Sequence, residues 1–410
     1  MIKILIKNAR IVDGTQDRAK DAVDILLADG HVQEVGASLK TSGDATVIDA
    51  KGGFVMPGLI DAHVHVIAQD ANLKQNAALP DAIVTVGAMN LMRGMLARGF
   101  TTLRDLGGAT GPLRAAMERA PVPLPRLNIC GKALSQTGGH TDQRGPFDDI
   151  PVPKWPVPLG SMGVICDGVP ELRKAAREQF CTGADFLKLM ANGGVSSPSD
   201  PIHFLGFSRD ELIAAVEEAG NAGTYVAAHL YTDQAILRAV ECGIHSLEHC
   251  NLISSETATL AAKNGCIACP TLITYDKLKS EGPLLGLPPA SIAKVDDVRL
   301  RGLESLSIMQ DAGLLMAYGS DLLGGMQPHQ SGEFELRGQV LKRQTVIQST
   351  TLIAAKLLRM EGLIGLLQPG AFADVILLDR NPLEDLSVLS GQGEGMTMII
   401  KDGEIIKHQL

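Results

Sequence analysis

Histidines and an aspartate close several short apolar runs of this sequence. His63 and His65 stand two apart in DAHVH, and residues two apart on a strand point to the same side, so both imidazoles can face one ion. His229 and His249 end two later runs, and Asp321 ends a third. Buried polar groups at strand ends need partners, which a metal supplies. We therefore predict a metal-dependent hydrolase; the alternative for the HxH pair is two packed core histidines.

Lys188 interrupts the apolar run DFLKLM. One interpretation is a buried stem whose amine reaches outward. An ammonium group beside two dications would be repelled, however, whereas a neutral lysine that has reacted with CO₂ forms a carbamate with two oxygens that can bridge both ions. We therefore expect two divalent metal ions and an N6-carboxylysine at Lys188. Oxygen and imidazole donors suit zinc, with manganese, cobalt or iron as substitutes.

The elements that must position these residues form a repeating pattern. Short apolar runs alternate with helical patterns, and Ser208 with Glu211 fits a capping box at the start of one such helix. The runs lie near residues 58–65, 100–105, 126–131, 185–190, 224–229, 244–249, 266–271 and 315–321. Eight β-α repeats predict an α/β fold, a (β/α)₈ TIM barrel, whose active site sits at the C-terminal ends of the strands.

Both ends of the chain read differently from the middle. The first ~55 and last ~45 residues alternate apolar and polar positions, with Asp-Gly turns typical of hairpins. We expect residues 1–57 and 367–410 to pair into one small β-sandwich domain, with the hydrolase barrel at 58–366 inserted between them. Two long connections, 132–168 with the only Trp (Trp155) and 275–300, are expected to cover the C-terminal face.

Composition excludes several classes of function. The 410 residues carry a net charge of −9 and no Lys/Arg-rich run, which argues against nucleic-acid or anionic-membrane binding. The apolar runs are only strand-length, so no transmembrane helix is expected. The N-terminus lacks the pattern of a signal peptide, which predicts a cytoplasmic protein unless a leader has been removed. Among seven scattered cysteines, Cys266 and Cys269 are expected to be small buried residues, with a metal or redox pair as the alternative.

Longer motifs resemble a known family. MPGLIDAHVH (56–65), Lys188, the two later histidines, Asp321 and PGAFADVILLD (369–379) are similar to the amidohydrolase superfamily. ALSQTGGH (133–140), KLMANGGVSSPSDP (188–201), EHCNLI (248–253) and SDLLG (320–324) resemble its prolidase-like group, the Xaa-Pro dipeptidases and metal-dependent carboxypeptidases, which includes ochratoxin-degrading enzymes. The resemblance implies one ion on His63, His65, Lys188 and Asp321, and a second on Lys188, His229 and His249.

Further roles are expected around this metal set. Asp321 can take a proton from the attacking water and pass it to the leaving amine. In similar enzymes the histidine of TGGH contacts the substrate, which makes His140 a candidate for binding the substrate carbonyl or carboxylate. Tyr231, two residues beyond His229, is a candidate partner for the oxyanion, with a rim residue bonded to a loop as the alternative. Arg104 and Arg144 are candidates for binding a substrate carboxylate, with structural salt bridges as the alternative.

The expected reaction is hydrolysis of the amide bond to a C-terminal amino acid in a dipeptide or an N-acyl amino acid, Xaa-Pro substrates and ochratoxin A included. The alternative is a cyclic-amide hydrolase of the imidazolonepropionase or dihydroorotase type. A non-catalytic scaffold is disfavoured, because all six ligand positions are kept. The resemblance further implies a small-molecule substrate and a homo-oligomer, such as an octamer.

Overall fold

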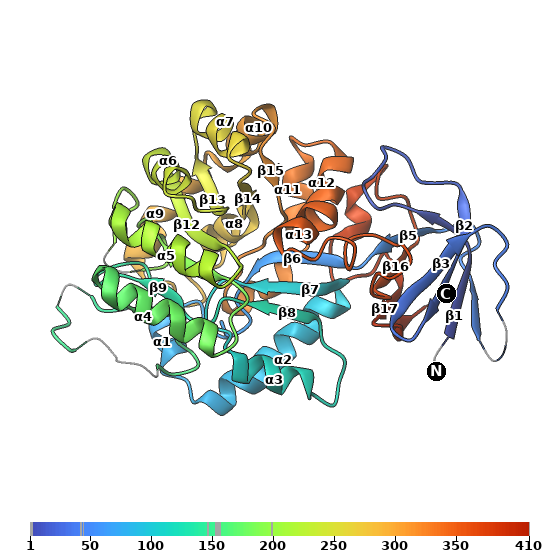
Figure 1. The fold of residues 1–410 in the computed structure, drawn as a ribbon, viewed down its shortest axis with the longest axis horizontal. Helices are drawn as coiled ribbons and strands as arrows, with labels where there is room; N and C mark the ends of the chain where they lie inside the picture. Colours follow the sequence, from blue (N-terminus) through green and yellow to red (C-terminus); the bar gives the residue numbers. More distant parts are fainter. Residues whose placement is uncertain are drawn as a thin grey trace.

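A computed structural model describes residues 3–41, 43, 45–145, 147–151, 157–197 and 200–409. The chain forms a large α/β body and a smaller β part that contains both termini (Figure 1). Trp155 lies outside the described residues, so its predicted position over the barrel stays a prediction.

The smaller part joins the two ends of the chain in one sheet. Its strands are β1 (Lys3–Ile11), β2 (Ala22–Ala28), β3 (His31–Gly36), β4 (Thr46–Asp49), β5 (Phe54–Pro57), β16 (Val375–Leu378), β17 (Met396–Lys401) and β18 (Glu404–His408). The order is β18-β17-β16-β5-β1-β2-β3, with β4 paired to β1. Antiparallel pairing of β5 with β16 confirms that both ends build one β unit. Its apolar cluster, which includes Ile4, Val55 and Ile400, is separate from the barrel core.

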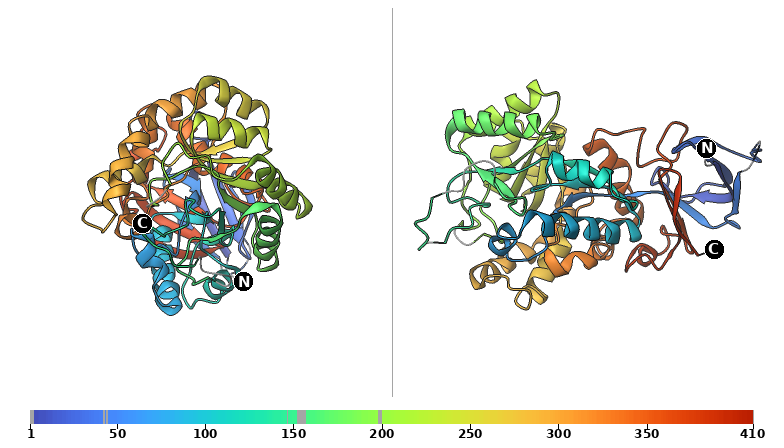
Figure 2. Two further views of the ribbon diagram at one scale, coloured as in Figure 1. Left: turned by 90° about the vertical axis from the view of Figure 1, so that its left-hand side faces the viewer. Right: turned by 90° about the horizontal axis from the view of Figure 1, so that it is seen from below.

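The larger part is a barrel of parallel strands, as predicted. Its strands are β6 (Leu59–Val64), β7 (Phe100–Asp105), β8 (Arg126–Ile129), β9 (Ala133–Ser135), β11 (Leu187–Met190), β12 (Val226–Thr232), β13 (Ser246–Leu252), β14 (Ile267–Cys269) and β15 (Leu315–Met316). Two backbone hydrogen bonds link its two sheets: Ala62 donates to Tyr318 and Asp185 donates to Ile129, each at 2.8 Å. Helices surround the strands when the molecule is viewed end-on (Figure 2, left).

One or more helices follow most of the barrel strands. They are α1 (Leu73–Ala77), α2 (Asp81–Ala97), α3 (Gly111–Glu118), α4 (Gly168–Cys181), α5 (Arg209–Asn221), α6 (Asp233–Glu241), α7 (Ser255–Lys263), α8 (Leu272–Ser280), α9 (Pro289–Arg299), α10 (Gly302–Asp311), α11 (Gly332–Gly338), α12 (Arg343–Thr350) and α13 (Leu352–Leu357). The predicted capping box of Ser208 and Glu211 opens α5. It stabilises the helix because both side chains bond backbone N–H groups that lack helical partners.

Several predicted bounds differ from the structure. The third run contains β8 and ends at Gly131, whose φ of 72° is left-handed and separates β8 from the unpredicted strand β9. The 132–168 connection also contains an unpredicted strand, β10 (Gly163–Ile165), and 275–300 is largely α8 and α9. The eighth run forms only the two-residue strand β15, which ends well before Asp321, because the chain there turns back toward β6.

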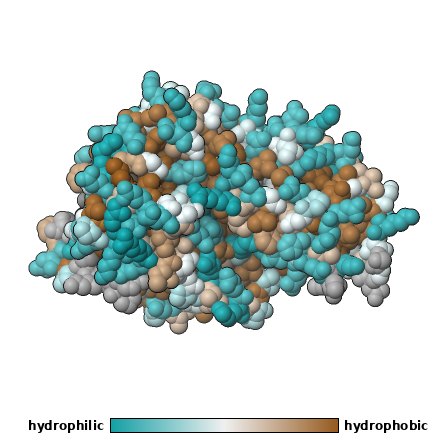
Figure 3. Space-filling view, viewed as in Figure 1, coloured by the Kyte–Doolittle hydropathy of each residue, from teal (hydrophilic) through white to brown (hydrophobic). Residues whose placement is uncertain are grey.

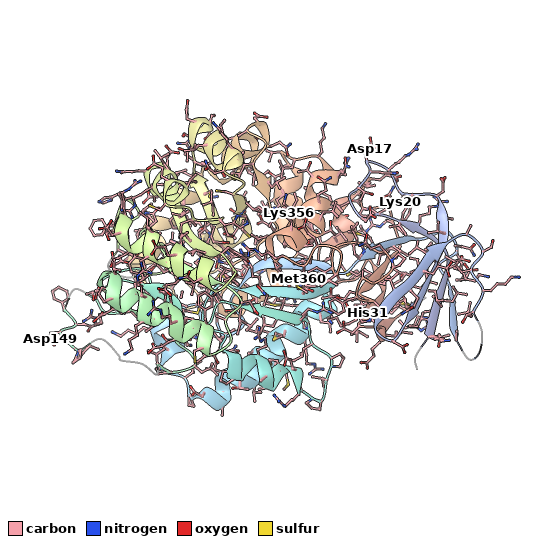
Figure 4. The ribbon with its side chains drawn as sticks, viewed as in Figure 1. Asp17, Lys20, His31, Asp149, Lys356 and Met360 are labelled. Atoms are coloured by element: carbon pink, nitrogen blue, oxygen red, sulfur yellow. The ribbon has the colours of Figure 1, made fainter. Side chains whose placement is uncertain are left out.

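The C-terminal ends of the barrel strands face away from the terminal sheet. β6 begins two residues after β5 ends, so the barrel strands run outward from that sheet. Asp149, in the connection after β9, accordingly lies at the end of the molecule opposite Asp17 and Lys20 of the terminal part (Figure 4). Hydrophilic and apolar side chains are interspersed on the face seen in Figure 3.

Two further expectations concern the cysteines and the membrane. Cys266 and Cys269 are both buried and unbonded to each other, as expected for small buried residues. Within the described residues, no helix is long and apolar enough to cross a membrane.

Glu218 fastens α5 to α4 and gives a first testable prediction. Arg177 donates to both Glu218 oxygens, at 2.7 and 2.9 Å, and Arg173 donates at 2.8 Å. Arg177 foremost, with Arg173, lowers the pKa of Glu218 from 4.5. This stabilisation is therefore present above pH 4.5 and lost as the pH falls through the lower, folded-state pKa. We expect Glu218→Gln to lower Tm at neutral pH by about 1–2 °C, because the exposed arginines weaken the pairs.

Thermal melts of both proteins between neutral and acid pH test this. The difference should shrink at acid pH, where wild-type Glu218 is protonated. Glu217→Gln is the matched control, since Glu217 is more exposed and bonds only Arg173, so its effect should be smaller. A Tm difference between the wild type and Glu218→Gln that stays constant with pH would contradict the stabilising role of the ionised Glu218 carboxylate.

Candidate functional site

Asp321 lies at the meeting point of the predicted metal residues. Its Oδ1 is 3.3 Å from Nε2 of His63 and 3.2 Å from Nε2 of His65, and its Oδ2 is 3.9 Å from Nδ1 of His249. Asp321 is held there because its N–H donates to the His63 carbonyl at 2.8 Å. Gly319 allows this approach, since a Cβ there would lie 2.7 Å from that of His63.

The hydrogen bonds of His63, on β6, and of His65, just after it, direct the same nitrogen of each toward Asp321. His65 Nδ1 is 3.0 Å from the Gly107 carbonyl, and His63 Nδ1 is 2.9 Å from a Glu248 oxygen. A carbonyl only accepts, and a carboxylate bonded to arginine also accepts, so both Nδ1 atoms carry the proton. The Nε2 of each ring therefore faces Asp321 and is the atom that the ring can offer to a metal ion.

His229 on β12 and His249 on β13 complete the ring of imidazoles. Their ring centroids are 4.7 Å apart, and those of His63 and His249 are 4.9 Å apart. Burial lowers the pKa of both His229 and His249 well below the ordinary value, which keeps them neutral, as metal ligands must be. His249 has a φ of 70° and Asp321 has a φ of 52°, so both have the uncommon left-handed backbone conformation. Residues in this conformation are often found at functional sites.

Lys188 lies on β11 and lines the same cavity as these residues. Its side chain is only 2% exposed. Burial lowers the pKa of its amine, against the opposing attraction of Glu248 and Asp321. A neutral amine is the form that reacts with CO₂, so this environment favours the chemistry predicted for Lys188.

The donor set fits a divalent ion. Ligand atoms bonded to one ion at about 2.1 Å lie about 3–3.5 Å apart, and Oδ1 of Asp321 lies at such a distance from Nε2 of both His63 and His65. One donor atom from each of His63, His249 and Asp321 lies within 4.8 Å of the other two. The imidazoles hold the pKa of Asp321 well below its ordinary value, although burial alone would raise it, so the carboxylate is ionised for binding.

His140 and Tyr231 lie where the sequence predicted, at the wall of this cavity. His140 stacks on His229, with ring centroids 4.3 Å apart, and its Nδ1 is 3.0 Å from the Ser197 hydroxyl. A Cβ at Gly194 would lie 1.8 Å from the His140 ring, so glycine is required there. The Tyr231 hydroxyl is 3.0 Å from the Tyr275 hydroxyl, which also lines the cavity.

The two candidate arginines have structural partners, which confirms the alternative interpretation of each. Arg104 is fully buried against Glu248, at 2.8 Å. Arg144 bonds both oxygens of Asp142 in the connection after β9, and it does not line the cavity. Five other histidines of the chain do not line the cavity either: His31, His203, His245, His329 and His408.

Three residues of the site were missed from the sequence: Tyr275, Asp200 and Glu248. Asp200 is 2% exposed, and its carboxylate is 3.3 Å from His140 Nδ1. Glu248 is fully buried; burial would raise its pKa, yet Arg104 foremost keeps it lowered. Glu248 gave a usable signal, because it is an acidic residue inside the apolar run 244–249.

Comparisons with known proteins give one consistent family. Residues 54–406 match the amidohydrolase family. Ochratoxinase of Aspergillus niger is 32% identical over 373 residues, covering 86% of this chain and 75% of that protein.

Solved structures agree with this result. A crystal structure of an amidohydrolase is 47% identical with a TM-score of 0.97, and 100% of each chain is covered. A prolidase complexed with N-methylphosphonate-L-proline is 41% identical with a TM-score of 0.97, covering 99% of this chain and 100% of that one.

Proposed function

The chain belongs to the amidohydrolase family, whose members use divalent metal ions and hydrolyse amide bonds, and we propose that it cleaves the amide bond to a C-terminal amino acid with two such ions. The observation that carries the proposal is the convergence of His63, His65, His249, Asp321 and Lys188 in one cavity.

We assign the ligands as the sequence motifs imply. His63, His65, Asp321 and Lys188 would hold one ion, and Lys188, His229 and His249 would hold the other. Lys188 would serve as an N6-carboxylysine, since a carbamate offers two oxygen donors. Imidazole and carboxylate donors in this number suit Zn²⁺.

When bound, the ions would activate a water molecule and polarise the scissile carbonyl. Asp321, as an ionised carboxylate at the centre of the site, accepts the proton of that water and delivers it to the leaving amine. His140, stacked on His229 with its Nδ1 edge toward Ser197 and Asp200, is positioned to bind the substrate carbonyl or carboxylate. Tyr231 adds a hydroxyl that is held in place by Tyr275.

Residues beyond the ligands indicate the kind of substrate. The cavity wall includes the apolar side chains of Leu73, Met162, Met190, Leu278 and Leu323. These suit an apolar side chain on the substrate, such as proline or phenylalanine. Ochratoxin A is an aryl amide of L-phenylalanine and fits the same description, in keeping with the relationship to ochratoxinase.

Substrate assays test this proposal directly. We expect the purified, zinc-loaded protein to hydrolyse at least one of three groups: Xaa-Pro dipeptides, N-acyl-phenylalanines and ochratoxin A. Release of the free amino acid, followed by chromatography, is the measurement. Protein treated with a chelator is the control and should be inactive until zinc is restored.

The same assay examines the alternative of a cyclic-amide hydrolase. Opening a cyclic amide yields a single product and releases no amine fragment. Turnover of dihydroorotate or imidazolonepropionate, with no release of amino acid from any of the three groups, would replace the proposed substrate class.

A further inference from the structure

A buried carboxylate lies directly behind one of the proposed metal ligands. Glu248 on β13 is fully buried, and its Oε2 is 2.9 Å from Nδ1 of His63 on β6. Its other oxygen accepts hydrogen bonds from Arg104 at 2.8 Å and from the Ser246 hydroxyl at 2.6 Å. Both oxygens therefore have partners, and Glu248 is not among the residues that line the cavity.

The guanidinium group of Arg104 is itself held in place by several hydrogen bonds. Its Nε donates to the Ala62 carbonyl at 2.6 Å, and its Nη1 donates to Ser246 at 3.0 Å and to the Tyr225 hydroxyl at 3.3 Å. The guanidinium carbon also lies 5.2 Å from the centre of the Phe186 ring. The carboxylate of Glu248 thus has a fixed orientation and a buried counter-charge, which a buried anion requires.

The four imidazoles of the site differ in what stands behind them. His65 and His229 each approach a backbone carbonyl, Gly107 at 3.0 Å and Gly193 at 3.3 Å. His249 approaches the Thr271 hydroxyl at 2.8 Å. Among these four rings, His63 is the one whose second nitrogen is bonded to a carboxylate. A carboxylate that accepts from a ligand histidine fixes the ring orientation and raises its basicity, which strengthens the bond to the metal.

We propose that Glu248, braced by Arg104 and Ser246, is a positioning residue that makes the ion site of His63 and His65 the tighter of the two. The proposal rests on the two-ion site proposed above. The second site, with His229 and His249, has neutral partners behind its imidazoles, so it binds its ion more weakly. The protein then retains one ion when the other is removed.

Metal titration of the stripped protein is the test. Zinc is added in competition with a chromophoric chelator, which reports affinity without any substrate. We expect two steps for the wild-type protein. Glu248→Gln keeps the size of the side chain but removes its charge, and should weaken the tight step by about 10–100-fold while leaving the weak step unchanged.

Glu333→Gln is the matched control. Glu333 and Arg337 form another fully buried pair, 2.8 Å apart, and Glu333 also accepts from the N–H groups of Leu272 and Ile273. Its replacement takes an acceptor carboxylate from a buried arginine, as Glu248→Gln does, but touches neither His63 nor Glu248. We expect a lower Tm of the metal-free protein with wild-type affinity in the tight step.

The outcomes separate the two proposals. An unaltered tight step in Glu248→Gln, or equal weakening in both variants, would overturn the role of Glu248. Wild-type protein that binds no zinc would instead overturn the two-ion function itself. Should Glu248→Gln fail to fold, Ser246→Ala removes one of the two donors to the second Glu248 oxygen, and it must weaken the same step for the inference to stand.

Discussion

A Lys188→Ala protein is expected to lose the second metal ion and to have its amidase activity reduced by roughly 10³-fold or more, since the activated water depends on both ions. Lys188 is 2% exposed on β11, in the cavity lined by His63, His229 and Asp321. Without it, no other residue of that lining can supply a bridging carboxylate, apart from Asp321 itself. Metal content by atomic spectroscopy and kcat by product release are the measurements.

The control for Lys188→Ala must distinguish the effect of losing the amine from the effect of the cavity that the shorter side chain leaves. Truncation of a buried side chain also destabilises the fold through the space it leaves. Lys188→Met keeps most of the volume and removes only the amine, so it should retain a near-native Tm and yet show the same loss of metal and activity.

Rescue of Lys188→Ala by short carboxylic acids provides a second test of the carbamate role of Lys188. In Lys188→Ala the space of the carbamate is vacant, so propionate at high concentration can place a carboxylate between the ions. Partial return of both metal and activity is expected, and Lys188→Met should respond less because its side chain fills the space. Full activity in Lys188→Ala without any added acid would show that no carbamate is needed.

The barrel was predictable because its parallel strands are buried on both faces and therefore read as short apolar runs. Each of the eight runs overlaps a barrel strand of the structure. The bounds failed where site residues depart from regular strand geometry. β12 and β13 continue past His229 and His249, to Thr232 and Leu252, and Asp321 lies beyond the end of β15 with a φ of 52°. The pattern of apolar residues does not predict such local backbone conformations.

The candidate site was predictable only as far as its residues interrupt or close apolar runs of the sequence. His63, His65, Lys188 and Asp321 stand out in this way, and the structure brings them together. The contacts that hold them come from pairs far apart in the chain. Arg104 and Glu248 are separated by 144 positions, and Tyr231 and Tyr275 by 44. A single sequence does not reveal such pairs. For this reason Arg104 was a candidate for binding the substrate carboxylate, whereas the structure pairs it with Glu248.

An Asp321→Asn protein is expected to bind ions but to turn over at least about 10²–10⁴-fold more slowly, the range contributed by a positioned general base. The amide keeps the shape of the side chain and one oxygen that can bind the ion beside His63 and His65, whose Nε2 atoms lie 3.3 and 3.2 Å from Oδ1. It cannot accept the proton of the attacking water. The loss should therefore fall on kcat, with KM changed much less.

Metal content distinguishes this role from a purely structural one. Asp321→Asn should retain most of its zinc, in contrast to Lys188→Ala, because the imidazoles and the carbamate remain. Asp296→Asn is the matched control, since Asp296 lies on α9 and pairs with Lys279 and Arg299 away from the cavity; its activity should equal that of the wild type. An Asp321→Asn protein with wild-type kcat would assign the proton transfer to another group, and His140 would be the next to examine because it is the remaining imidazole at the cavity wall.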